Sequence, residues 1–171
     1  KLFYWHAIAA SLGADVPVCF ADRAVWMSAV GDHLHDLSWP LPQLHAVLVN
    51  PRSPVPGDKT ARVFRALGAP PISGSGDGVA TARPAIPDRD ELLALMHRMG
   101  KDLEAPATAV VPQVQDVLAA LETCSGAEIA HLSGAGPTCF AVFPTRALAT
   151  SAAASLVAAH PSWWIVPTVI G

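Results

Sequence analysis

The amino-acid sequence predicts an α+β fold in which an antiparallel sheet carries helices on one face. Four short runs have the apolar alternation that is typical of strands: 44–49, 128–132, 138–143 and 163–170. Between them, apolar residues recur at helical spacing. Because a hairpin joins two of these strands and helices join the others, a layer of helices on an antiparallel sheet is the simplest architecture.

The first part of the chain is predicted to contain a buried helix over Leu2–Leu12, which Gly13 ends. Val16–Phe20 and Ala24–Val30 are predicted to form a pair of strands. We assign residues 1–36 to the remnant of a neighbouring, incomplete domain and residues 37–171 to the main domain.

The helices of the main domain are predicted from their period and their end signals. They are Thr60–Leu67 before Gly68, Leu92–Leu103 after two acidic residues, Val114–Leu121 after Pro112, and Thr145–Ala159 with a threonine cap. The segment Ala69–Pro87 is rich in Pro, Gly and Ser and is predicted to be an exposed loop.

Composition excludes several classes of protein. The chain has 171 residues, 51% of them hydrophobic, and a net charge of −3. Its richest apolar stretch, 147–170, is interrupted by polar residues and proline, so no membrane span is predicted. The basic residues are scattered, and we therefore expect no nucleic-acid partner.

The three cysteines, Cys19, Cys124 and Cys139, are far apart and have apolar neighbours. They are predicted to be buried thiols of a cytoplasmic protein, with neither zinc spacing nor a disulfide framework. Because the chain begins with lysine, we expect a further segment before residue 1. The sequence does not indicate an oligomeric state.

A first candidate site is Asp15, in the run Leu12-Gly13-Ala14-Asp15-Val16-Pro17. A carboxylate at a domain boundary can accept the proton of a substrate hydroxyl while phosphate is transferred to it. The alternative is a turn in which Asp15 only accepts hydrogen bonds from nearby backbone amides.

A second candidate is the run Ser133-Gly134-Ala135-Gly136-Pro137-Thr138, between two predicted strands. Glycines allow backbone N–H groups to converge on an anionic oxygen, because no side chain blocks the approach. The run lacks the Gly-Lys-Ser/Thr ending of a Walker A loop. An ordinary hairpin turn of small residues stays an alternative.

Together these two runs resemble the kinases of the galactokinase, homoserine kinase, mevalonate kinase and phosphomevalonate kinase (GHMP) superfamily. Leu-Gly-Ala-Asp-Val-Pro at 12–17 and Asp-Leu-Glu-Ala-Pro at 102–106 are similar to the branch that phosphorylates 4-diphosphocytidyl-2-C-methyl-D-erythritol. The resemblance implies a ferredoxin-like carboxy-terminal domain. It also implies ATP with Mg²⁺ and transfer of phosphate to the 2-hydroxyl of that small molecule, in the non-mevalonate route to isoprenoids.

The resemblance also implies roles for particular residues. Asp15 would be the catalytic base, and Gly134, Ala135, Gly136 and Thr138 would line the phosphate end of the site. Thr60 and Phe64 would contact the substrate, the phenyl ring stacking on cytosine. From local pattern alone, Phe64 is instead a core residue of a short helix.

The sequence departs from the family at several points. The glycine-rich ATP loop and the amino-terminal lysine do not occur in these residues, so the resemblance places them before residue 1. Lys101 stands where the family has asparagine, and 57–59 resembles a short insertion.

Three other functions remain open at this stage. The chain could act on mevalonate or homoserine, be a non-catalytic remnant that binds a ligand, or be a metal hydrolase that uses His33 and His35. For the two histidines a solvated turn is the alternative.

Overall fold

The structure is a computed structural model that describes residues 2–13, 16–21, 23–28, 33–37, 40–69 and 88–171. It divides into two compact units. The larger comprises Gln43–Pro71 and Arg89–Ile170, and the smaller comprises Lys1–Pro42, Ile72–Asp88 and Gly171. Each unit is described by itself.

A four-stranded sheet organises the larger unit. Its strands are β3 (Leu44–Asn50), β4 (Ile129–Leu132), β5 (Cys139–Phe143) and β6 (Trp164–Ile170). They lie in the order β4-β5-β3-β6, and every neighbouring pair is antiparallel. Pro167 is tolerated because β6 is an edge strand, where a missing N–H donor costs little. The predicted antiparallel sheet is confirmed, with the strand order of a ferredoxin-like fold.

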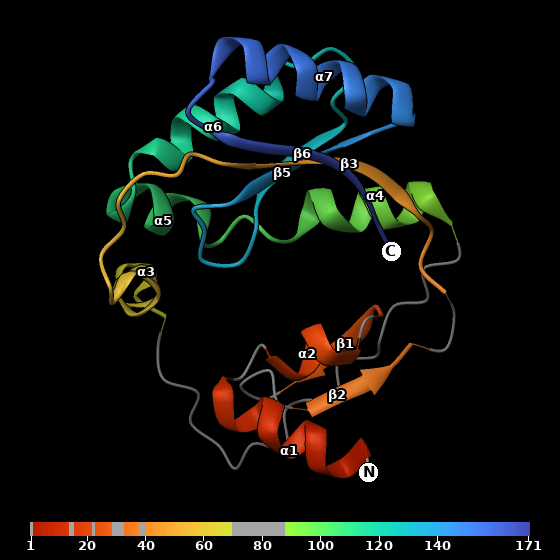
Figure 1. Ribbon diagram of the computed structural model, residues 1–171, viewed down its shortest axis with the longest axis vertical. Helices are drawn as coiled ribbons and strands as arrows, with labels where there is room; N and C mark the ends of the chain where they lie inside the picture. The colour runs from red at the N-terminus through yellow and green to blue at the C-terminus, as the bar shows by residue number, and fades with distance from the viewer. Residues whose placement is uncertain (1, 14–15, 22, 29–32, 38–39, 70–87) are drawn as a thin grey trace. The chain divides into compact units, whose positions relative to one another are not determined.

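Helices α6 (Gln113–Glu122) and α7 (Arg146–Ala159) cover one face of this sheet (Figure 1). Apolar side chains from both layers and from α3 (Lys59–Leu67) form the core, and the least exposed are Val47, Val49, Val63, Val114, Val117, Leu121, Cys139, Ala141 and Phe143. The α+β layering predicted from the sequence is therefore confirmed. Helix α4 (Arg89–Arg98) contacts β4 and lies on the other side of the sheet (Figure 1).

Two end signals read from the sequence have the expected geometry. The Thr145 hydroxyl accepts a hydrogen bond from the Leu148 N–H at 3.3 Å, which caps the amino end of α7. Gly68 ends α3 (Lys59–Leu67) in the left-handed conformation, with φ of 64°.

The predicted helix over Leu92–Leu103 was too long. Helix α4 ends at Arg98, and Gly100 takes a positive φ of 90°. Helix α5 (Glu104–Val110) follows and was not predicted, because it contains Pro106. A proline within the first turn breaks no helical hydrogen bond, since the N–H groups there have no intrahelical acceptor.

The smaller unit contains helices α1 (Leu2–Leu12) and α2 (Val16–Ala21) and strands β1 (Val25–Ser28) and β2 (His33–Asp36). The predicted strand at Val16–Phe20 is wrong, because this segment is helical and β1 pairs with β2. Short apolar runs do not distinguish strand from helix by period. The turn predicted at His33 and His35 is also wrong, because both residues lie in strand β2.

Burial in α1 is also less complete than expected. The helix predicted at Leu2–Leu12 is confirmed, but Trp5 is 55% exposed and Leu12 is 72% exposed. Ala9, in contrast, is buried. The prediction that this helix is buried is therefore wrong for part of its surface.

Some predictions lie outside the described residues. Nearly all of the predicted loop at Ala69–Pro87 does, and so does Asp15. The assignment of 1–36 and 37–171 to two domains stays a prediction. Within the part of the chain that is described, no helix is both long and apolar enough to cross a bilayer.

The three cysteines differ in their surroundings. Cys139 is buried, and burial together with the negative charge of Glu104 raises the pKa of its thiol to about 12. Burial also raises the pKa of the half-buried Cys124. Cys19 is exposed, so the prediction of a buried thiol is wrong there.

These environments predict the order in which the thiols react. At pH 8 an aromatic disulfide reagent should label Cys19 within the first phase, Cys124 more slowly, and Cys139 only after unfolding, because the thiolate is the reactive form. Time-resolved labelling in buffer and in urea measures this order. In the Cys19→Ser variant the first phase should disappear, and its persistence would contradict the assignment.

Candidate functional site

The predicted phosphate-binding run forms a tight turn between β4 and β5. The Ser133 N–H donates to the Thr138 carbonyl at 2.9 Å, and the Gly136 N–H donates to the Ser133 carbonyl at 3.0 Å. The sequence predicted that Gly136 lines the phosphate end of the site, and its N–H already has an acceptor within the turn. The amides of Gly134 and Ala135 are the remaining candidates.

Both glycines of the turn are required by the backbone, for different reasons. Gly134 and Gly136 have φ of 56° and 68°, in the left-handed region that residues with a Cβ atom rarely adopt. A Cβ on Gly136 would lie 2.7 Å from Cδ1 of Leu132, whereas a Cβ on Gly134 would meet no atom within 4 Å. The space beside Gly134 is thus open to a ligand, and the space beside Gly136 is filled.

Helix α3 reaches the turn through its first residue. The Lys59 ammonium donates hydrogen bonds to the carbonyl oxygens of Ala135, at 3.0 Å, and of Gly136. The lysine is half-buried, and the loss of solvent lowers the pKa of its ammonium. Sequence reasoning missed this residue, since 57–59 was interpreted only as an insertion.

The end of β3 holds the other side of the turn. Asn50 Nδ2 donates to the hydroxyl of Thr138 at 2.9 Å, while Asn50 Oδ1 accepts from the backbone N–H of Arg52 at 2.8 Å. Arg52 has a positive φ of 52°. The Thr138 hydroxyl therefore has a partner within the protein, and it still has a proton to donate.

The predicted substrate pair lies on the same helix as Lys59. Thr60 and Phe64 are one turn apart on α3, and both are exposed, Phe64 by 54%. The interpretation of Phe64 as a core residue is wrong, because Val63 is the residue of α3 that enters the core. An exposed ring on the helix that touches the turn is compatible with stacking on a base.

Asp15, the predicted catalytic base, belongs to the smaller unit and lies outside the described residues. The structure therefore brings together the turn and α3 but does not test the position of the carboxylate. The expectation that Asp15 and the turn face one cleft stays a prediction.

A buried pair lies behind the turn, at the start of α5. The Nδ1 atom of His131 lies 3.1 Å from a carboxylate oxygen of Glu104, and the histidine is 4% exposed. Its Nε2 atom has no partner among the described residues. Lys101, which departs from the family pattern, is exposed and lines a cavity of about 170 Å³ together with His131. This pair ties α5 to β4 on the strand that leads into the turn.

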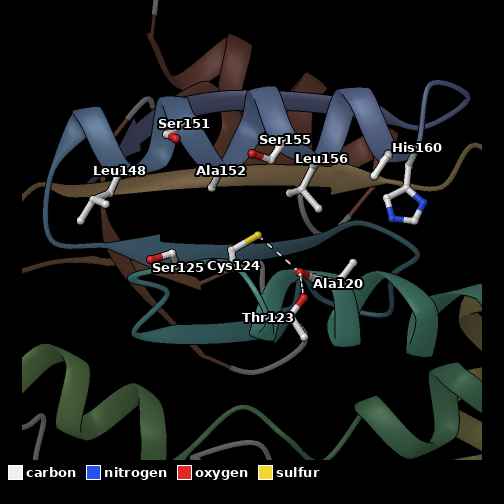
Figure 2. Close-up of a pocket in the computed structure, with 11 residues that line it drawn as sticks. Ala120, Thr123, Cys124, Ser125, Leu148, Ser151, Ala152, Ser155, Leu156 and His160 are labelled. Carbon is white, nitrogen blue, oxygen red and sulfur yellow. Dashed lines mark hydrogen bonds between the residues drawn. The ribbon is translucent and has the colours of Figure 1, made fainter.

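A larger cavity of about 420 Å³ lies between the end of α6 and helix α7 (Figure 2). Thr123 and Cys124 both donate to the Ala120 carbonyl at its floor, at 2.9 and 3.3 Å. Ser151 and Ser155 add hydroxyl groups from α7. None of the site residues predicted from the sequence lines this cavity.

The metal-hydrolase interpretation gains no support from the residues that are described. Among them, no group of three or more His, Cys, Asp or Glu side chains could hold a metal ion.

Comparison with known proteins connects this geometry to a family. Residues 79–162 match the family model for the GHMP kinase C-terminal domain. A 4-diphosphocytidyl-2-C-methyl-D-erythritol kinase of Rhodopseudomonas palustris is 46% identical over 160 residues, which cover 90% of this chain and 51% of that protein. The kinase of the same name from Methylobacterium radiotolerans is 45% identical over 167 residues, which cover 96% of this chain and 55% of that protein.

A solved structure is similar as well. The crystal structure of a 4-(cytidine 5'-diphospho)-2C-methyl-D-erythritol kinase superposes with a TM-score of 0.67 at 29% identity, over 98% of this chain and 57% of that one. The chain thus spans about half the length of the relatives that it matches.

The two glycines predict different responses to substitution. Gly134→Ala should lower the free energy of unfolding by about 1 kcal/mol, the cost of a left-handed alanine. Gly136→Ala should cost at least about 1 kcal/mol more, because its methyl group also collides with Leu132. Urea unfolding of the two variants beside the unchanged chain measures the difference, and equal costs would contradict the packing described.

Proposed function

We propose that this chain forms the carboxy-terminal part of an ATP-dependent small-molecule kinase, because residues 79–162 match the model for the GHMP kinase C-terminal domain. The proposed acceptor is the 2-hydroxyl of 4-diphosphocytidyl-2-C-methyl-D-erythritol, in the non-mevalonate route to isoprenoid precursors. The names of relatives at 46% and 45% identity support this substrate.

One observation carries the proposal: the contact of Lys59 with the glycine turn. It sets the start of α3 beside the candidate phosphate site, through hydrogen bonds to Ala135 and Gly136. Phe64, five residues further along the same helix, has an exposed ring. A ligand with an aromatic base and a phosphate chain needs both features at one end of the domain.

In the proposed reaction the substrate hydroxyl attacks the γ-phosphorus of ATP. The new P–O bond forms as the bond to the β-phosphate oxygen breaks, and ADP leaves. Asp15 orients the hydroxyl and accepts its proton. The amides of Gly134 and Ala135 donate to phosphate oxygens, where negative charge builds up. Mg²⁺ enters as part of the ATP substrate, bound to its phosphates.

The other kinases of the superfamily are the second candidates. A mevalonate or homoserine kinase has no base to recognise, and the exposed Phe64, on the helix whose first residue contacts the glycine turn, favours the cytidine-bearing substrate. A non-catalytic remnant that only binds ligand is the third candidate. For the kinase, we propose a cytoplasmic location. We also propose that residues 1–36 are part of its amino-terminal domain and that residues 37–171 form its carboxy-terminal domain.

Ligand-dependent stability discriminates among these substrates. Cytidine diphosphate should raise the melting temperature of the chain, while mevalonate and homoserine should not. Phe64→Ala should weaken the binding of cytidine diphosphate by about tenfold, because stacking of a base on an aromatic ring contributes about 1–3 kcal/mol. Val157→Ala, an exposed apolar residue of α7, is the matched control. Stabilisation by homoserine or mevalonate and not by the nucleotide would favour the second candidates.

Substitution of the predicted base tests the chemistry. Asp15→Asn should lower kcat by about a hundredfold or more and leave KM within about threefold, because only proton transfer is lost. Phosphotransfer is measured on the 171-residue chain and on any longer form encoded upstream of Lys1. A near-normal rate would remove Asp15 from the mechanism, and absence of transfer in every form would favour the non-catalytic remnant.

A further inference from the structure

The carbonyl oxygens of a turn are a problem for an anion site, because their partial negative charges repel phosphate. Two of them, on Ala135 and Gly136, point at the ammonium of Lys59. A charged donor on both oxygens offsets this repulsion.

The two carbonyls belong to peptide units that have no N–H to offer a ligand. The carbonyl of Ala135 shares its peptide unit with the Gly136 N–H, which already donates to Ser133. The carbonyl of Gly136 precedes Pro137, which has no N–H. Lys59 therefore binds the part of the turn that cannot donate, and the amides of Gly134 and Ala135 remain for a ligand.

The charge of Lys59 is not neutralised by a neighbouring carboxylate. Its neighbour Asp58 pairs with Arg62 at 2.7 Å. None of the ion pairs within the described residues includes Lys59. The hydrogen-bond partners of this half-buried ammonium are neutral carbonyls, so no carboxylate offsets its charge, and a partly buried charge is screened less than an exposed one.

We propose that Lys59 converts the glycine turn into a binding site for the phosphate chain of a nucleotide. It acts as a positioning residue, which holds the Ala135 and Gly136 carbonyls away from the ligand, and it supplies the positive charge that a polyphosphate requires. This inference rests on the proposed function and names the residue by which this chain recognises phosphate.

Binding of two defined probes tests the proposal on the chain as it exists. Isothermal titration with inorganic tripolyphosphate and with ADP should show affinity that Lys59→Met weakens by about tenfold or more, because a charged hydrogen-bond donor is lost. Lys59→Arg should retain affinity within about threefold, since it keeps the charge. Arg65→Met is the matched control, because it removes one charge from the exposed, far end of α3 and should leave affinity unchanged.

The affinity should also depend on salt. Raising the ionic strength should weaken tripolyphosphate binding to the unchanged chain more steeply than binding to Lys59→Met, because one charge interaction is absent from the variant. A purely structural role for the lysine would not change this slope. If Lys59→Met fails to fold, Lys59→Gln, which keeps a neutral donor, carries the same comparison.

The outcomes separate this inference from the proposed function. Equal affinity in folded Lys59→Met and the unchanged chain would overturn the inference, and so would absence of binding to both probes. Equal weakening by Arg65→Met would overturn it as well, because the effect would then be one of net charge. Polyphosphate binding that depends on Lys59, without phosphotransfer in any form of the protein, would uphold the inference and reject the kinase function.

Discussion

Strand β3 is hydrogen-bonded along both edges, and the candidate site depends on this constraint. It pairs with β5 through five residues and with β6 through seven, and its Ala46, Val47 and Val49 side chains are fully buried. A strand held on both sides cannot shift without breaking two ladders. Its final residue, Asn50, therefore has a fixed place from which it binds Thr138.

The turn between β4 and β5 is held from both sides by a segment far away in the sequence. Asn50 reaches it from 88 residues away and Lys59 from 77 residues away. The position of β3 within the sheet determines the contact of Asn50 with Thr138. The position of the start of α3 determines the contact of Lys59 with Gly136. Because Val63 anchors α3 in the core, the exposed face with Thr60 and Phe64 keeps its orientation relative to the turn.

Secondary structure was predicted well where a segment had a clear period or end signal. The strands of the larger sheet, α6, α7 and the cap at Thr145 agree with the structure, because alternation and capping are local properties. Prediction failed at Val16–Phe20, where five apolar residues suit a helix and a strand equally. Helix α5 was not predicted either, although a helix tolerates a proline such as Pro106 in its first turn.

The sequence by itself indicated that the run 133–138 forms a turn of small residues between two strands, because turn residues and strand alternation are local signals. The structure added that Gly134 and Gly136 have positive φ and that Leu132 leaves no room for a side chain at Gly136. The sequence also determined the four-residue spacing of Thr60 and Phe64. Only the tertiary structure decided that Phe64 is exposed and that Lys59 binds the turn. The hydrophobic period of a short helix does not show which of its faces packs against the rest of the protein. A hydrogen bond between residues 77 positions apart also depends on the register of the whole sheet.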